Sequence, residues 1–134
     1  MTMSDLIKQG IVRKTPLNNA RAQSLLEMSA QTMKVILALD LNEQNASVIF
    51  RELYECLRST LEAIGYKKGY KFENHESIKF FASEILQNNA LAKDFDRYRK
   101  IRNGINYYGD KVAIETAKKI VEDIPKYIEE ISVK

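Results

Sequence analysis

The sequence is poor in the residues that shape several fold classes. It has a single cysteine, Cys56, which excludes an internal disulfide and fits a reducing compartment. Five glycines and two prolines in 134 residues leave little material for tight turns, which argues against a sheet-rich fold. No run of about 18 apolar residues is present, so no membrane span is expected. The start also lacks the continuous apolar segment of a signal peptide. We therefore expect one cytoplasmic domain over residues 1–134.

Charge is mild overall, at +3, and supports nucleic-acid binding only where it clusters on one face. Residues 93–102 carry five basic and two acidic side chains. The segment YKKGYK, residues 66–71, mixes lysine with tyrosine, as nucleic-acid contacts do, although a solvated loop is the alternative. Acidic residues gather instead between 122 and 130. The chain therefore has a basic side and an acidic end.

Helical periodicity recurs along the chain, and no strand-like alternation of apolar and polar residues is evident. Gly65 is expected to end the second helix in the left-handed conformation. The apolar stripes predict five helices, over about residues 18–41, 43–64, 75–87, 91–108 and 111–131. Short connections favour antiparallel neighbours. We therefore expect an all-α fold, an antiparallel up-down bundle of about five helices.

The most informative segment is DRYRKIRNGINYYGD, residues 96–110. Its apolar residues step by three or four, as in an amphipathic helix. Arg99 and Asn103 are four residues apart, as are Arg102 and Asn106, so each pair shares a helix face. Such a ridge of arginine and amide side chains either is simply solvated or binds an anion.

The two tyrosines at the end of this segment are adjacent, so their side chains point about 100° apart. Tyr108 continues the apolar stripe and is predicted to be buried. Tyr107 is then left near the ligand-facing side of the helix.

Metal and cofactor chemistry find little support in the sequence. His75 is the only histidine, so no two-histidine metal site is possible, and no carboxylate cluster compensates. No glycine-rich phosphate loop with its lysine occurs, and no cofactor is expected. His75 follows a capping asparagine, which favours a local hydrogen bond; an acid–base role is the alternative. Cys56 lies between Leu53 and Leu57 and is expected to be a small buried side chain.

Three features in order resemble the HEPN domain family (higher eukaryotes and prokaryotes nucleotide-binding). The first is the long second helix with RELYECLRSTLEAIG, residues 51–65. The second is the turn in GYKFENHESIKFF, residues 69–81, and the third is RNGINYYG, residues 102–109, at a helix end. The last is similar to the family's motif of an arginine, a polar residue and a histidine after four to six positions. The resemblance covers roughly residues 18–131.

The resemblance implies an antiparallel helical bundle that forms a homodimer with both motif helices facing a shared cleft. Many family members cleave RNA without a metal, using the motif histidine in acid–base catalysis and the arginine on phosphate. Others only bind nucleotides or RNA. Several are toxins encoded beside a minimal nucleotidyltransferase antitoxin, which modifies a motif tyrosine in some of them; Tyr107 and Tyr108 are the corresponding candidates here.

The sequence departs from the family motif at the histidine. Counted from Arg102, that residue should stand at 107, 108 or 109, where the chain has Tyr107, Tyr108 and Gly109. A phenol with a pKa near 10 is a poor base at neutral pH, whereas imidazole titrates there. We therefore expect binding without efficient RNA cleavage.

The sequence thus predicts a domain that binds RNA or a nucleotide, as part of a toxin–antitoxin or defence-type module. The predicted ligand-binding residues are Arg99, Arg102, Asn103, Asn106 and Tyr107. The first alternative is an active metal-independent ribonuclease, with Arg102, Tyr107 and His75 as the candidate catalytic residues. The second is a helical interaction module that pairs with an adjacently encoded nucleotidyltransferase.

Overall fold

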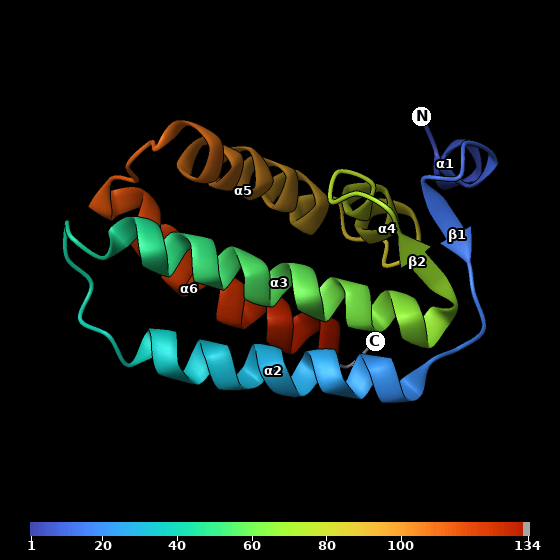
Figure 1. Cartoon of the computed structure of the whole chain (residues 1–134), viewed down its shortest axis with the longest axis horizontal. Coiled ribbons are helices and arrows are strands. Elements are labelled where there is room, and N and C mark those ends of the chain that lie inside the picture. Colours follow the sequence, from blue (N-terminus) through green and yellow to red (C-terminus); the bar gives the residue numbers. More distant parts are fainter. Residues whose placement is uncertain (133–134) are drawn as a thin grey trace.

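The computed structural model describes residues 1–132, and this part of the chain forms six α-helices and two short β-strands (Figure 1). In chain order the elements are α1 (Met3–Lys8), β1 (Val12–Lys14), α2 (Asn19–Leu37), α3 (Ala46–Lys68), β2 (Tyr70–Phe72), α4 (Ile78–Glu84), α5 (Asn89–Tyr108) and α6 (Ile114–Ser132). Helices dominate, and each strand has only three residues. The predicted all-α character is therefore confirmed.

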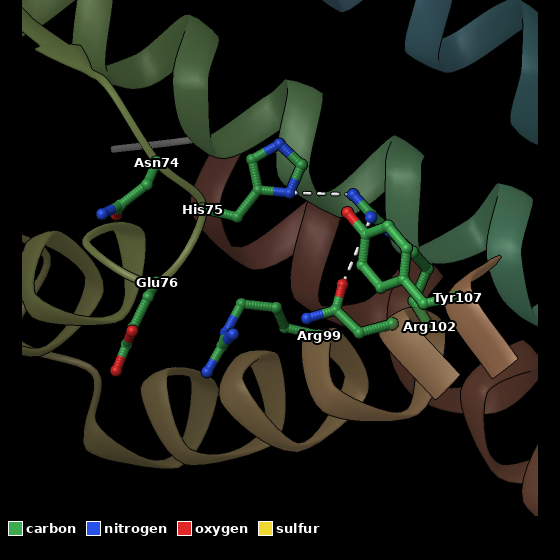
Figure 2. A pocket seen from close by; sticks show the side chains of 7 residues that line it. Asn74, His75, Glu76, Arg99, Arg102 and Tyr107 are labelled. Atoms are coloured by element: carbon green, nitrogen blue, oxygen red, sulfur yellow. Dashed lines mark hydrogen bonds between the residues drawn. The ribbon is translucent and has the colours of Figure 1, made fainter. Parts of the chain in front are cut away.

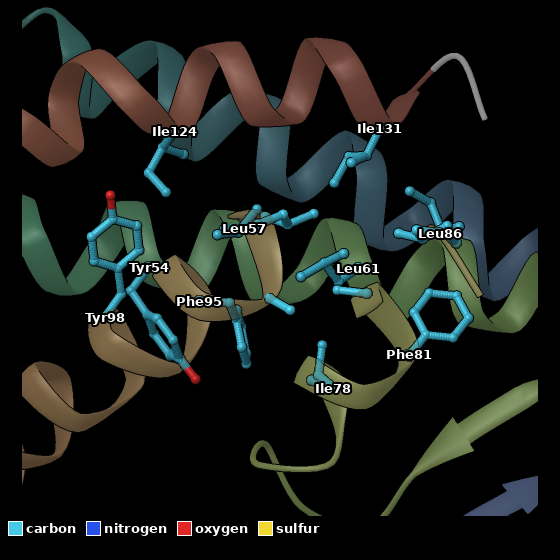
Figure 3. Packing of buried hydrophobic residues seen from close by; sticks show 14 of the residues in the cluster. Tyr54, Leu57, Leu61, Ile78, Phe81, Leu86, Phe95, Tyr98, Ile124 and Ile131 are labelled. Atoms are coloured by element: carbon cyan, nitrogen blue, oxygen red, sulfur yellow. The ribbon is translucent and has the colours of Figure 1, made fainter. Parts of the chain in front are cut away.

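Helix α3 is the centre of the fold. Helices α2, α5 and α6 all pack against it, and α2 runs beside it in the opposite direction (Figure 1). Rings from α3 and α5 interlock: Tyr54 stacks on Phe95 with centroids 5.4 Å apart, and Phe50 meets Tyr98 edge-on at 5.8 Å. Figure 3 shows this aromatic layer continuing into the aliphatic side chains of α3 and α6. Cys56 is buried, as predicted.

The two-stranded sheet of β1 and β2 and the short helix α1 were not predicted. The strands pair antiparallel with Val12 opposite Phe72 and Lys14 opposite Tyr70. Strand β1 has three residues, of which only Val12 is buried, so the sequence shows no alternation of apolar and polar residues there. The two strands are separated along the chain by the whole of α2 and α3, so the sheet depends on contacts between distant residues.

The prediction that Gly65 ends the second helix is wrong. Helix α3 continues for almost another turn, to Lys68, and Gly69 ends it with a left-handed φ of 86°. Gly65 instead serves close packing, because a Cβ atom there would lie 2.6 Å from Cε2 of Phe72. Lys67 and Lys68, which were placed in a loop, belong to the last turn of α3.

The other helix limits differ from the prediction by a few residues, because some asparagines cap turns and not helices. Asn42 Oδ1 accepts the N–H groups of Gln44 and Asn45 at 2.8 and 3.0 Å, and α3 begins only afterwards. Asn74 Oδ1 likewise accepts the N–H of Ser77 at 2.9 Å, so α4 is shorter than expected. Helix α6 begins at Ile114, three residues after the predicted start at residue 111.

Candidate functional site

A polar cavity of about 310 Å³ lies between α5 and the loop that leads into α4. Its lining residues are Asn74, His75, Glu76, Arg99, Arg102, Asn103 and Tyr107 (Figure 2). Four of the five predicted ligand-binding residues are therefore brought together, and His75 joins them from a distant part of the chain. Asn106 is exposed and does not line the cavity.

Arg102 is the most enclosed member of the site, with 7% of its surface exposed. One terminal nitrogen, Nη2, lies 2.9 Å from His75 Nδ1 and 3.1 Å from Glu55 Oε1. The other, Nη1, donates to Asn103 Oδ1 at 3.3 Å. The guanidinium also lies over the Tyr54 ring, 5.1 Å from its centroid. We call Tyr54, Glu55, His75, Arg102 and Asn103 the Arg102 cluster.

His75 is held in one protonation state by its neighbours. Its Nδ1 lies 2.9 Å from Arg102 Nη2 and 3.2 Å from the Tyr54 hydroxyl. A guanidinium can only donate, so Nδ1 must be the accepting nitrogen, and the ring proton of the neutral imidazole is on Nε2. Burial and the nearby guanidinium groups of Arg58 and Arg102 lower the pKa of His75 to about 4. At neutral pH the histidine is therefore an uncharged hydrogen-bond donor through Nε2.

Arg99 is oriented by an ion pair on its own helix. Its Nε and Nη2 both donate to Asp96 Oδ1, at 3.1 and 2.9 Å. Lys79 Nζ approaches the other carboxylate oxygen of Asp96 at 3.6 Å. Burial opposes the effect, but hydrogen bonds from Arg99 and Lys100 lower the pKa of Asp96. The pairing uses two nitrogens of Arg99 and leaves its Nη1 for a ligand.

The two tyrosines at the end of α5 differ from the prediction in one respect. Tyr107 lines the cavity and is 70% exposed, in agreement with its expected place near the ligand-facing side. Tyr108 is 81% exposed, so the prediction that it is buried is wrong. The side chain at the end of α5 is thus left open to solvent by the described residues, and the buried stripe of α5 ends before Tyr108.

A chain of charges on α3 supports the site, and sequence reasoning missed it. Arg58 donates to Glu55 Oε2 from Nε at 2.9 Å and from Nη2 at 2.7 Å, and its Nη1 lies 2.9 Å from Glu62. Glu55 then bridges Arg58 and Arg102. The spacing of Glu55, Arg58 and Glu62 at three and four residues predicts ion pairs along one helix. It carries no signal that Arg102 of another helix completes the chain.

The described part of the chain lacks a metal-ligand cluster and a helix that could span a membrane. Residues 1–132 contain no group of three or more histidine, cysteine, aspartate or glutamate side chains placed to hold a metal ion. Within the same residues, no helix combines the length and the apolar character needed to cross a bilayer.

Comparison with known proteins adds no relative: no family model, curated protein or solved structure matches this chain. The resemblance to HEPN domains therefore depends on the motif residues alone. The chemistry of the cavity has to be argued from its geometry.

Proposed function

We propose that this chain is a HEPN-like domain, an up-down helical bundle that binds RNA or a nucleotide through a phosphate held in the polar cavity. The observation that carries the proposal is the lining of that cavity, where two guanidinium groups face a single carboxylate, that of Glu76. Glu76 is engaged by Lys79, whose Nζ lies 3.6 Å from Oε1. The remaining lining residues offer neutral N–H and O–H donors.

These donors suit the oxygens of a phosphate. His75 contributes Nε2–H, Arg99 its Nη1, Asn103 its side-chain amide and Tyr107 its hydroxyl. Arg102 Nη1 carries a second N–H besides the one donated to Asn103, and this second group is also available to the phosphate. Hydrogen bonds from a charged guanidinium to an anionic oxygen are roughly twice as strong as neutral ones. Asp96 and Glu55 weaken the positive potential, but they also hold the two arginines in place, so little side-chain entropy is lost on binding. We expect modest affinity that falls as salt rises.

The same geometry supports binding without efficient cleavage. A general base needs a free lone pair, and the one on His75 Nδ1 is occupied by Arg102 and Tyr54. The Nε2 atom carries the proton and cannot accept another at neutral pH. Acid–base assistance requires a group whose pKa lies near the working pH, and a histidine with a pKa of about 4 does not meet that condition.

A second candidate function, metal-independent ribonuclease, is favoured by one observation. Nδ1 of His75, the only histidine of the chain, lies 2.9 Å from Nη2 of the motif residue Arg102, although the two residues are far apart in sequence. If an RNA phosphate drew Arg102 away from Nδ1, the imidazole could exchange its proton between the two nitrogens and act as a base. His75 would then replace the histidine that the motif lacks.

An RNA-binding and cleavage assay decides between the two functions. Purified protein is mixed with a fluorescent single-stranded RNA, and anisotropy and gel analysis are read from the same samples. We expect salt-sensitive binding and no cleavage above background, and we expect this same result for the wild type and for His75→Gln. Cleavage that His75→Gln abolishes would establish the ribonuclease. Tyr107→His tests the motif itself, because a gain of cleavage there would identify a degenerate nuclease scaffold.

The proposal includes a two-fold homodimer, as the resemblance implies. Helix α2 also exposes Met28 and Val35, which are two helical turns apart on one face and are 63% and 61% exposed. This face lies across α3 from α5 (Figure 1), so it is separate from a cleft shared by two motif helices. Apolar side chains repeated along one face are typical of a surface that packs against a partner. Light scattering should give twice the chain mass of 15.5 kDa. A mass of one chain at micromolar concentration would exclude the dimer.

A further inference from the structure

A second cavity, of about 380 Å³, lies on the other side of the loop that carries His75. It differs from the first in character, because Leu6, Ile11 and Phe80 give it apolar walls. Polar groups stand at its edge, from Gln9, Asn74 and Glu76. Neither Arg99 nor Arg102 lines this cavity.

The two cavities share two lining residues of one short loop. Asn74 and Glu76 line both of them, and His75 between them lines only the first. Figure 2 shows the His75 ring turned toward Arg102, with the side chains of Asn74 and Glu76 extending from the opposite side of the loop. A ligand with its anionic group beside Arg102 can therefore extend past this loop into the second cavity.

The wall made by α1 is fixed in place. The N–H of Met3 donates to Glu84 Oε2 at 2.8 Å and so ties α1 to α4. Thr2 and Asp5 form a capping box at the start of α1. Leu6 is 3% exposed, so the helix is anchored by its apolar side. The cavity is therefore formed before any ligand arrives.

The chemistry of the second cavity matches an unpaired nucleobase, which has flat apolar faces and a polar edge. Phe80 is partly buried and offers a ring for stacking, with Lys79 Nζ 5.2 Å from its centroid. Asn74 has its Oδ1 engaged by Ser77, which leaves the amide N–H groups for a base edge. Gln9 adds a second amide. Stacking on aromatic rings is the usual way in which proteins hold single-stranded bases.

We propose that the second cavity binds a nucleobase of the strand whose phosphate lies beside Arg102, so that the ligand is a single-stranded nucleic acid. This inference rests on the proposed function, because it requires a phosphate in the first cavity. An apolar small molecule would fit the walls, but it would make no use of the donors next to them. The two lining residues that the cavities share therefore favour a ligand with both a phosphate and a base, a nucleotide unit.

The test compares a short single-stranded RNA with an oligonucleotide of the same length and charge that lacks bases, both by fluorescence anisotropy at low salt. One base stacked on an aromatic ring should make the RNA bind roughly 5- to 100-fold more tightly. Phe80→Ala should remove this difference and leave the affinity for the abasic strand unchanged. Phe80→Leu, which keeps an apolar side chain but no ring, should remove most of it. Tyr108→Ala, an exposed aromatic residue outside both cavities, is the matched control and should change neither affinity.

The outcomes separate this inference from the proposed function. If both strands bind wild type equally, or if Phe80→Ala and Phe80→Leu weaken them by the same factor, the base cavity is refuted and phosphate binding stands. If neither strand binds at low salt, both proposals fail. Circular dichroism melts of the two Phe80 variants confirm that the bundle is folded in each binding measurement.

Discussion

Two buried regions meet on α3, and they are built in opposite ways. The apolar core is made of many side chains that each contact several others, so no single pair decides its geometry. In the Arg102 cluster, every member depends on a particular partner: Arg102 on Glu55 and His75, and His75 on Tyr54 and Arg102. The core therefore supplies stability, whereas the cluster supplies defined positions for hydrogen-bond donors.

The largest effect is expected in the core. Leu57 is fully buried, and Leu57→Ala should lower the free energy of unfolding by about 2–5 kcal/mol, because it removes apolar contacts and leaves a cavity. Urea unfolding followed by circular dichroism measures it. Val48→Ala is the control, since Val48 is 42% exposed and its loss should cost less than about 0.5 kcal/mol. Equal losses for both variants would contradict the assignment of the core.

A smaller loss of stability but the largest loss of binding is expected at Arg102. Arg102→Ala should cost about 1–3 kcal/mol of stability, because Glu55 keeps its bonds to Arg58 while His75 loses a partner. RNA affinity should fall about 10-fold or more, the range for a hydrogen bond from a charged group. Lys67→Ala, at an exposed lysine outside the cavity, should change the affinity much less.

Anisotropy titrations at two salt concentrations measure this contrast. The salt dependence should become shallower for Arg102→Ala, because one phosphate contact is lost. Equal losses for the two variants, or wild-type binding that ignores salt, would locate the ligand outside the polar cavity.

The smallest effect is a dependence of stability on pH that comes from His75. Its pKa is lowered from 6.5 to about 4 by folding, so between these values the unfolded chain binds more protons than the folded one. The contribution of His75 is therefore complete above pH 6.5 and is lost as the pH falls toward 4. Unfolding midpoints at pH 7 and pH 5 should differ more for the wild type than for His75→Gln, which cannot titrate. Identical differences would show that folding does not lower the pKa of His75.

Much of the helical content could be predicted because it depends on local spacing. The stripe of α5 that includes Phe95 and Tyr98 repeats every three or four residues, and any helix burying one face must show that repeat. Helix α5 ends at Tyr108, the limit that the sequence predicted, and Gly109 follows it with a φ of 68°. Features that depend on contacts between distant segments could not be predicted from local spacing. The pairing of β1 with β2, which places Val12 opposite Phe72, is the clearest case.

The site was predictable as a list of residues but not as an arrangement. The spacing of Arg99, Arg102 and Asn103 indicated one face of α5, and all three residues line the cavity. Their environment was not predictable, since Arg102 is enclosed by Glu55 and His75 from two other segments. The burial of Arg102 thus follows from tertiary packing, which a helical period alone does not describe.

The pairing of β1 with β2 has a consequence for the order of folding. The α2–α3 pair joins neighbouring segments, whereas β1 can reach β2 only after the long stretch between Val12 and Phe72 has been brought together. Closing so large a loop has an entropic cost, and only the completed two-stranded sheet and its packing on α3 offset it. We therefore expect β1 and α1 to form last and to open first by local unfolding. The second cavity, whose wall includes α1, would then be completed only after α2 and α3 have packed together.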